Sequence, residues 1–414
     1  MKKIVCCILV CIQMITFLTL PCWVQADSPA DPGELYAKSA CLLDGDSGRV
    51  LWGKEENTAL PMASTTKIMT CILALEEGKG DEIATASKNA AGQPKVHLGV
   101  HEGQKFYLED LLFSLMLESH NDAAVVIAEH IGGSVEGFAE MMNAKAAEIG
   151  CEDTHFVTPN GLDKEDAGGA HHTTAADLAR IMRYCVRESP QAERFIAITQ
   201  TPSHSFTDLE GQQSYGCTNH NALLSMMDGV VSGKTGFTAK AGYCYICAVE
   251  SNGRLFIVSL LACGWPNNKG YKWKDTRQIL SYAGDSYIYR NVLKEPVSDS
   301  VPVEGAVYPW GKSSSPVEMA IEEKRDDGEE LSLLLREDEA VQVETNIPKR
   351  LTAPVYAGEE VGKVTYKLYG KVCAEYPLVC KEDLGEATLP WAIGQVVQVF
   401  FLRIPGRVGA EMAD

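Results

Sequence analysis

The chain has 414 residues, a formal net charge of −19 and a hydrophobic fraction of 45%. This length suggests two or three domains, and the hydrophobic fraction is normal for a globular protein with a sizeable core. The acidic balance argues against a nucleic-acid partner, which needs a basic face.

Residues 1–26 have the pattern of a secretory signal. Two lysines precede an apolar run from Ile4 to about Leu20, and small-residue spacing at Val24 and Ala26 marks a cleavage site after Ala26. The run is short for a spanning helix, and an uncleaved membrane anchor is the alternative. We therefore expect an exported, peripheral protein at the outer face of the cytoplasmic membrane or in the cell wall.

Four of the 14 cysteines lie in this signal segment. The other ten are scattered, and many lie in apolar runs, which is typical of buried free thiols. Cys244 and Cys247 have zinc-ligand spacing, but no second pair or histidine cluster accompanies them, so a structural role is favoured.

Residues 27–292 are expected to form one domain. A β-hairpin is predicted over residues 39–54, and a helix over 65–78. Two apolar helices should meet at "ESHND", and another should start at Ser134 and end at Gly150. Further segments alternate between the two types: a helix begins near Thr173, strands follow residue 230, and a helix covers 271–292. Strands at both ends with helices between them imply one sheet built from distant segments.

The composition changes near residue 293. Several prolines and short β-type runs predict a β-rich domain over residues 293–386. Residues 387–414 predict an amphipathic helix in a membrane interface, with Trp391, Phe400 and Phe401 inward and two arginines near the headgroups. A helix packed back on the β-rich domain is the alternative.

Three short motifs suggest chemistry. Ser64 and Lys67 form the only Ser-x-x-Lys match in the chain, and they open an apolar helix. A serine here is a plausible helix cap, but a lysine at i+3 also projects from the same face and could take the hydroxyl proton if burial or a nearby cation lowers its pKa. The motif alone does not decide between these two interpretations.

The second motif, Ser-x-Asn, occurs twice. The copy at Ser87 and Asn89 is in a polar, surface-like segment. The copy at Ser119 and Asn121 interrupts a long apolar stretch, where polar groups without partners would be costly, and we therefore choose it. Ser119 could pass a proton to a leaving amine, and Asn121 could hold Lys67 and a substrate carbonyl.

The third motif is Lys234-Thr235-Gly236 in a strand-like run. Gly236 permits close approach of a ligand backbone, while Lys234 and Thr235 offer a charge and a hydroxyl to a substrate carboxylate. A surface turn is the structural alternative for this motif taken alone.

The three motifs, in this order, resemble those of the penicillin-recognising serine enzymes, and in particular the low-molecular-mass penicillin-binding proteins that are D-alanyl-D-alanine carboxypeptidases. Further segments, such as "THFVTPNGL", "HHTTAADLA" and "TNHNALL", are similar to that family's pattern over roughly residues 35–292. The resemblance implies an α/β (α+β) fold of the serine β-lactamase and penicillin-binding-protein type, in which helices flank an antiparallel sheet. A small all-β domain and a C-terminal amphipathic helix would follow it.

The resemblance also implies a mechanism that needs no metal and no cofactor. The substrate would be a peptidoglycan stem ending in D-Ala-D-Ala, with β-lactams as inhibitors. Ser64 would form the acyl-enzyme, and the oxyanion would be held by the backbone N–H groups of Ser64 and Phe237. His171 and His172 are expected to belong to a helix-start network rather than a zinc site.

Two departures from the family pattern are visible. His120 stands where a small residue is common, and could alter access at the rim of the site or β-lactam affinity. The residues "VVSG" before the third motif are less typical. Two other functions were considered: a β-lactamase, which shares the motifs, and a catalytically silent peptidoglycan-binding protein.

Overall fold

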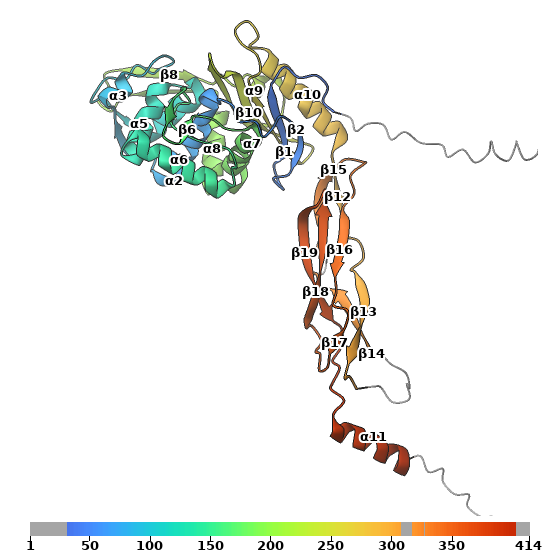
Figure 1. Ribbon diagram of the computed structural model, residues 1–414. Coiled ribbons are helices and arrows are strands. Elements are labelled where there is room, and N and C mark those ends of the chain that lie inside the picture. Colours follow the sequence, from blue (N-terminus) through green and yellow to red (C-terminus); the bar gives the residue numbers. More distant parts are fainter. Residues whose placement is uncertain (1–30, 308–316, 327, 403–414) are drawn as a thin grey trace, which may run out of the picture. The chain divides into compact units, whose positions relative to one another are not determined.

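The computed structural model describes residues 31–307, 317–326 and 328–402. The expected signal segment, residues 1–26, and the end of the expected tail, residues 403–414, lie outside them. The chain divides into two compact units after Ser286, and each unit is described by itself (Figure 1).

An antiparallel sheet of five strands forms the centre of the first unit, with the order β2-β1-β11-β10-β9. The hairpin expected near the start of the unit is confirmed, and the strands that complete its sheet come from far downstream in the sequence. The strands are β1 (Ser39–Asp44), β2 (Val50–Lys54), β9 (Val230–Thr238), β10 (Gly242–Ser251) and β11 (Arg254–Leu261). Because β9 is an edge strand, one of its sides is open to a ligand that could pair with it.

Helices cover both faces of this sheet (Figure 1). Helix α7 (Ala175–Arg183) packs on β1 and β11, while α10 (Tyr271–Ser286) packs on β10 and β11. Neighbouring residues of β10 point to opposite faces, since Tyr245 contacts Trp273 of α10 and Ile246 belongs to the main apolar core. The sheet is therefore buried on both faces.

The first unit has further helical segments besides α7 and α10. They are η1 (Ala63–Thr66), α2 (Lys67–Glu77), α3 (Lys88–Ala91), α4 (Leu108–Phe113), η2 (Ser114–Glu118), α5 (Asn121–Gly132), α6 (Val135–Ile149), η3 (Tyr184–Glu188), α8 (Ala192–Gln200) and α9 (Leu223–Met226). The predicted ends of α6 are confirmed. The Ser134 side chain accepts a hydrogen bond from Gly137 N at the start of this helix, and Gly150 takes a φ of +84° at its end.

Three small two-stranded sheets complete the first unit. They pair β3 (Ile83–Thr85) with β4 (Lys105–Tyr107), β5 (Glu165–Asp166) with β6 (Gly169–Ala170), and β7 (Ser203–Thr207) with β8 (Ser214–Thr218). The ten cysteines beyond the signal segment are unpaired, as predicted, and most of them are buried.

The last helix of the first unit is shorter than expected. The prediction of a helix over residues 271–292 is wrong at its end, because α10 stops at Ser286 and β12 (Ile288–Asn291) follows. Those four residues pair with β15 (Ser332–Leu335). They are therefore extended because they belong to a sheet of the second unit.

The second unit is β-rich, as predicted. Its six-stranded sheet has the order β16-β18-β19-β14-β13-β17 around a core that includes Val301, Met319 and Leu378. The strands are β13 (Ser298–Glu304), β14 (Val317–Glu323), β16 (Gln342–Asn346), β17 (Leu351–Thr352), β18 (Glu360–Leu368) and β19 (Lys371–Cys380).

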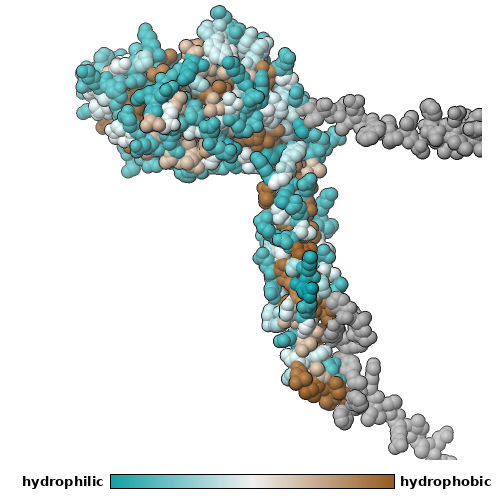
Figure 2. All heavy atoms as spheres, in the orientation of Figure 1, coloured by the Kyte–Doolittle hydropathy of each residue, from teal (hydrophilic) through white to brown (hydrophobic). Residues whose placement is uncertain are grey.

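The last described element is helix α11 (Leu389–Leu402). Its apolar side chains are unusually exposed: 75% for Leu389, 56% for Ile393 and 57% for Val396. Figure 2 shows hydrophobic residues gathered over this helix. Among the described residues, no helix combines the length and the apolar character that crossing a membrane requires.

Candidate active site

Ser64 lies in a short turn that leads into a helix. Residues 63–66 form the 3-10 turn η1, and α2 begins at Lys67. Ala63 has a φ of +50°, which is uncommon for a residue with a side chain, and its carbonyl accepts a hydrogen bond from the Thr66 hydroxyl at 2.8 Å. The prediction that Ser64 stands at a helix start is confirmed.

The amine of Lys67 is surrounded by three oxygen atoms. Its Nζ lies 2.9 Å from Ser64 Oγ, 2.9 Å from Asn121 Oδ1 and 2.6 Å from the main-chain oxygen of Asn160. The first two contacts join the predicted Ser-x-x-Lys and Ser-x-Asn motifs, which are far apart in the sequence. The third contact comes from a residue that sequence reasoning did not choose.

The environment of Lys67 disfavours its charged form. The side chain is fully buried, and this burial holds the pKa of the amine well below its ordinary value. The positive charge of Lys234 lowers the pKa further, and the carboxylate of Asp122 works in the opposite direction. Burial and the second cation therefore favour the neutral amine that a general base requires.

The three contacts also fix where the lone pair of a neutral Lys67 points. A neutral amine has two N–H donors and one lone pair, whereas Asn121 Oδ1 and the Asn160 carbonyl can only accept. These two oxygens take both N–H groups, which leaves the lone pair for the hydroxyl of Ser64. The amide of Asn121 is held in this orientation because its Nδ2 donates to the carbonyl of Pro94 at 3.2 Å.

The Ser-x-Asn motif joins two helices. Ser119 has a left-handed φ of +67° after the π-helical turn η2, and Asn121 is the first residue of α5. Between them, His120 is 8% exposed, and its Nδ1 lies 2.8 Å from Ser114 Oγ. His120 is not among the residues that line the pocket, and its side chain bonds inward to Ser114, so the structure gives no support to an effect of His120 on access.

Strand β9 supplies the third motif. Lys234 Nζ donates to Ser119 Oγ at 2.9 Å, and burial lowers the pKa of Lys234 to about 7. A Cβ on Gly236 would lie 2.9 Å from the backbone nitrogen of Ser64, so only glycine allows β9 to approach the nucleophile this closely. The Phe237 side chain is 41% exposed beside the site.

The predicted residues surround one pocket of about 560 Å³. It is lined by Ser64, Ser119, Asn121, Thr235, Gly236 and Phe237. Lys67 and Lys234 lie behind this lining and reach it through the hydroxyls of Ser64 and Ser119. The structure therefore brings together all eight residues that the sequence analysis selected.

Among the residues of the site that sequence reasoning did not select are Asn160 and Lys272. Asn160 acts through its main-chain oxygen, which no side-chain motif can reveal; the "NG" at 160–161 signals only a turn. Lys272 lines the pocket with its Nζ 4.8 Å from the ring centre of Tyr243 and 4.7 Å from that of Trp273. Burial lowers the pKa of Lys272 to about 8.

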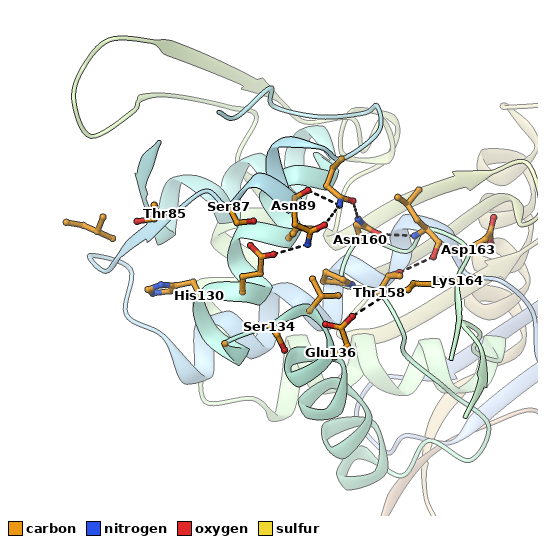
Figure 3. Close-up of a pocket in the computed structure, with 18 residues that line it drawn as sticks. Thr85, Ser87, Asn89, His130, Ser134, Glu136, Thr158, Asn160, Asp163 and Lys164 are labelled. Carbon is orange, nitrogen blue, oxygen red and sulfur yellow. Dashed lines mark hydrogen bonds and ion pairs between the residues drawn. The ribbon is translucent and has the colours of Figure 1, made fainter. Parts of the chain in front are cut away.

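A second pocket, of about 770 Å³, adjoins the first across the loop of residues 158–164. The side chain of Asn160 faces it, together with Thr158, Asp163 and Lys164 (Figure 3). The Asn160 amide donates to Gln93 Oε1 at 3.0 Å, so this residue is held from both sides. Asn160 therefore contributes to both pockets. Its side chain lines the second pocket, and its main-chain oxygen contacts Lys67 Nζ behind the first.

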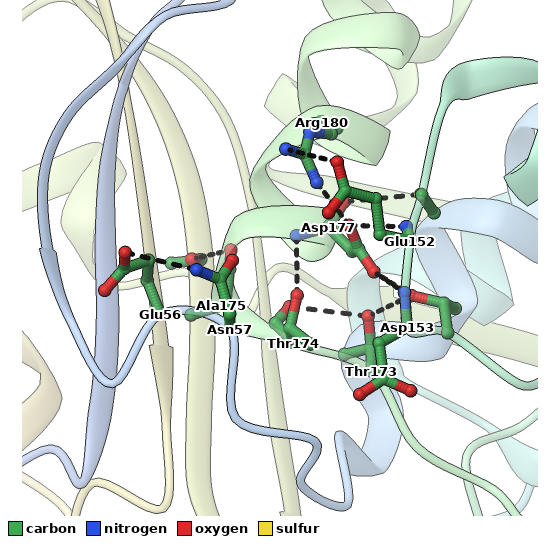
Figure 4. Close-up of polar contacts among 12 residues, drawn as sticks. Glu56, Asn57, Glu152, Asp153, Thr173, Thr174, Ala175, Asp177 and Arg180 are labelled. Atoms are coloured by element: carbon green, nitrogen blue, oxygen red, sulfur yellow. Dashed lines mark hydrogen bonds and ion pairs between the residues drawn. The ribbon is translucent and has the colours of Figure 1, made fainter. Parts of the chain in front are cut away.

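The helix-start network expected at His171 and His172 is found around His172, whereas His171 contacts Thr66 and Val157 instead. Thr174 caps α7 by accepting from the backbone of Asp177, whose carboxylate in turn accepts from the backbone of Asp153 (Figure 4). His172 Nε2 lies 3.0 Å from an Asp153 carboxylate oxygen. In the part of the chain that the structure describes, no group of three His, Cys, Asp or Glu side chains is arranged to hold a metal ion.

The fold and the site together define the class of penicillin-recognising serine enzymes. The family model described as D-alanyl-D-alanine carboxypeptidase matches residues 25–263, more than half of the chain, and the C-terminal domain of penicillin-binding protein 5 matches residues 329–386. The chain therefore belongs to the D-alanyl-D-alanine carboxypeptidase family, and it is a penicillin-binding, serine-type D-Ala-D-Ala carboxypeptidase.

Individual relatives and structures agree with this assignment. The carboxypeptidase DacF of Bacillus subtilis is 29% identical over 396 residues, which cover 94% of this chain and 96% of that protein. DacD of Francisella tularensis has a similar fold, with a TM-score of 0.67 at 22% identity over 88% of this chain and 97% of that one. A cefotaxime-bound penicillin-binding protein of Listeria monocytogenes is 26% identical, with a TM-score of 0.52 over 62% of this chain and 99% of that one.

Proposed function

We propose that Ser64 is the nucleophile of this carboxypeptidase and that neutral Lys67 is its general base. The observation that carries the proposal is the set of three contacts at Lys67 Nζ. In a neutral amine, Asn121 and Asn160 take the two N–H groups, which leaves the lone pair for the Ser64 hydroxyl. Ser64 Oγ attacks the carbonyl of the penultimate D-alanine of a peptidoglycan stem while its proton passes to Lys67.

The remaining residues bind the substrate and stabilise the charge that develops. Lys234 and Thr235 hold the terminal carboxylate, with Lys272 as a second positive charge on the same pocket. The backbone N–H groups of Ser64 and Phe237 hold the oxyanion, and one such donor is worth about 3–4 kcal/mol. Ser119, which accepts from Lys234, relays the proton that Lys67 took from Ser64 to the nitrogen of the departing D-alanine as the C–N bond breaks. Water then hydrolyses the acyl-enzyme and releases the shortened stem.

Mass spectrometry after incubation with penicillin tests this proposal, together with an assay of D-alanine release from a pentapeptide stem. We expect a stable adduct on Ser64 and release of one D-alanine. Rapid penicillin turnover without an accumulating adduct would instead support a β-lactamase. No adduct and no released D-alanine would support a silent peptidoglycan-binding protein.

Substitution of Lys234 by methionine should weaken productive binding of the stem. A hydrogen bond to a charged group is worth about 1.5–3 kcal/mol, so we expect kcat/KM to fall about 10- to 150-fold. The Lys240→Met variant is a matched control, because Lys240 is exposed in the turn after the same strand. Equal kcat/KM values for the two variants would contradict the carboxylate-binding role.

We also propose that the chain is exported and that α11 binds the membrane surface. The apolar run before Ala26 supports export, and the exposed side chains of Leu389, Ile393 and Val396 support binding in an interface. Deletion of residues 389–414 should release the protein from sedimented phospholipid vesicles, while the Ser64 adduct still forms. A truncated protein that sediments as before would contradict the role of α11.

A further inference from the structure

His171 lies between the turn that presents Ser64 and the loop that contributes Asn160. It is 3% exposed, and its Nε2 lies 2.8 Å from the hydroxyl of Thr66. On the other side of the ring, Nδ1 accepts a hydrogen bond from Val157 N at 3.0 Å. The imidazole touches neither Ser64 nor the pocket, so none of the proposed chemical steps uses it.

The direction of these hydrogen bonds can be derived from the contacts. The Val157 N–H can only donate, so Nδ1 must be the unprotonated nitrogen and Nε2 must carry the proton. Burial, together with the smaller effects of the facing His155, His172 and Lys67, lowers the pKa of His171 to about 3, so the ring is neutral at pH 7. His171 therefore donates to Thr66 Oγ1, whose own proton is free to bond the Ala63 carbonyl at 2.8 Å.

The same residue holds the opposite wall of the site. Val157 begins the segment that leads to Asn160, and the main-chain nitrogen of His171 donates to the carbonyl of Lys164 at 2.9 Å, at the far end of this loop. The loop is also held at Pro159, whose carbonyl accepts from Thr70 of α2 at 2.6 Å.

We propose that His171 is a positioning residue for the nucleophile, acting through Thr66 on the left-handed Ala63 and through Val157 on the loop that presents the Asn160 carbonyl. These two links fix the direction of Ser64 Oγ and the position of an oxygen that binds Lys67 Nζ. The inference rests on the proposed function, because it supposes that Ser64 is acylated with Lys67 as the base.

Substitution of His171 by asparagine or by glutamine tests its hydrogen bonds to Val157 and Thr66 separately. An asparagine at position 171 places its amide near Nδ1, where it can accept from Val157 but cannot reach Thr66. A glutamine reaches the position of Nε2 and can donate to Thr66. Because a 1 Å misplacement of reacting groups can cost about 100-fold, we expect His171→Asn to lower the acylation rate constant about 10- to 100-fold. His171→Gln should lose less than His171→Asn, since it restores the link to the nucleophile turn, but it should stay below wild type because it lacks the link to Val157.

Stopped-flow acylation by a chromogenic β-lactam measures the rate constant separately from the dissociation constant of the first complex. The final amount of labelled Ser64 gives the folded fraction. We expect a slower rate constant, an unchanged dissociation constant and full labelling for His171→Asn. A purely structural role would instead reduce the labelled fraction and leave the rate constant of the folded protein unchanged, which would overturn the proposal.

Thr66→Val offers an independent route if the asparagine variant does not fold. It removes the hydroxyl that links His171 to Ala63, and it should slow acylation by a similar factor. The double variant Thr66→Val with His171→Asn should be no slower than the slower single variant, because both break one chain of hydrogen bonds. Multiplied losses would contradict the proposal.

His172→Asn is the matched control, because this neighbour contacts Asp153 instead of the nucleophile turn, and its rate constant should equal that of wild type. A wild-type rate constant for His171→Asn would refute the positioning role and leave the proposed function intact. Wild-type protein that forms no adduct on Ser64 would refute the proposed function itself.

Discussion

Replacement of Lys67 by arginine is expected to lower the acylation rate constant of Ser64 by about 10²- to 10⁴-fold, the usual contribution of a general base. Arginine keeps its charge at all accessible pH values, so it has no lone pair for the Ser64 proton. Stopped-flow acylation by a β-lactam measures the loss. The stability of the variant should be compared by thermal unfolding, because burial of a permanent charge is itself costly.

Lys145→Arg is the matched control for that substitution. Lys145 Nζ lies 3.2 Å from a Glu76 carboxylate oxygen and 2.9 Å from one of Glu148, so its positive charge is paired with two carboxylates. Acylation by this variant should equal that of wild type. Unchanged acylation by Lys67→Arg would exclude Lys67 as the base.

The pH dependence of acylation follows from the same assignment. The folded-state pKa of Lys67 lies well below its ordinary value, so the amine is charged only below this lowered pKa. The acylation rate constant should therefore rise with pH through the lowered pKa and then level, with no further rise near the ordinary lysine value.

Gly161→Ala is expected to have the second large effect. Gly161 has a φ of +83°, and a Cβ there would lie 1.9 Å from the Ala63 carbonyl oxygen. Backbone strain and overpacking together should lower the free energy of unfolding by about 2–5 kcal/mol. The forced shift moves both the nucleophile turn and the Asn160 carbonyl, so acylation should fall at least about 100-fold.

Gly150→Ala is the matched control, because it introduces the same backbone strain without displacing a neighbouring residue. Gly150 has nearly the same φ, +84°, but no atom lies within 4 Å of the position of a Cβ. This variant should lose about 1–2 kcal/mol of stability and keep the wild-type acylation rate constant. If Gly161→Ala acylates as fast as Gly150→Ala, the loop does not position the site as described.

Much of the fold could be predicted because the local signals agreed with the packing. Ser134 and Gly150 mark the ends of α6, and the apolar strands β10 and β11 form the buried centre of the sheet. The end of α10 could not be predicted in this way. Residues 288–291 pair with a strand at residues 332–335, and pairing between such distant segments leaves no local trace in the sequence.

The side chains of the site could be predicted from the sequence, but its backbone features could not. Ser64 and Lys67 are conspicuous as the only Ser-x-x-Lys match, which opens an apolar helix. Asn121 is conspicuous because polar residues interrupt an apolar stretch, where they need partners. The Asn160 carbonyl and the left-handed Ala63 are backbone features, so residue types do not reveal them. The inward direction of His120 could not be predicted for a related reason, since its hydrogen bond to Ser114 depends on the π-helical turn between them.

The proposed mechanism requires a neutral Lys67 beside Ser64 at pH 7. The most direct measurement is the titration of the Lys67 side chain by NMR in protein carrying ¹³C-labelled lysine, assigned by comparison with Lys67→Arg. We predict a Cε chemical shift typical of a neutral amine at pH 7 and a titration midpoint well below the ordinary lysine value. A signal that titrates near that ordinary value would contradict the account.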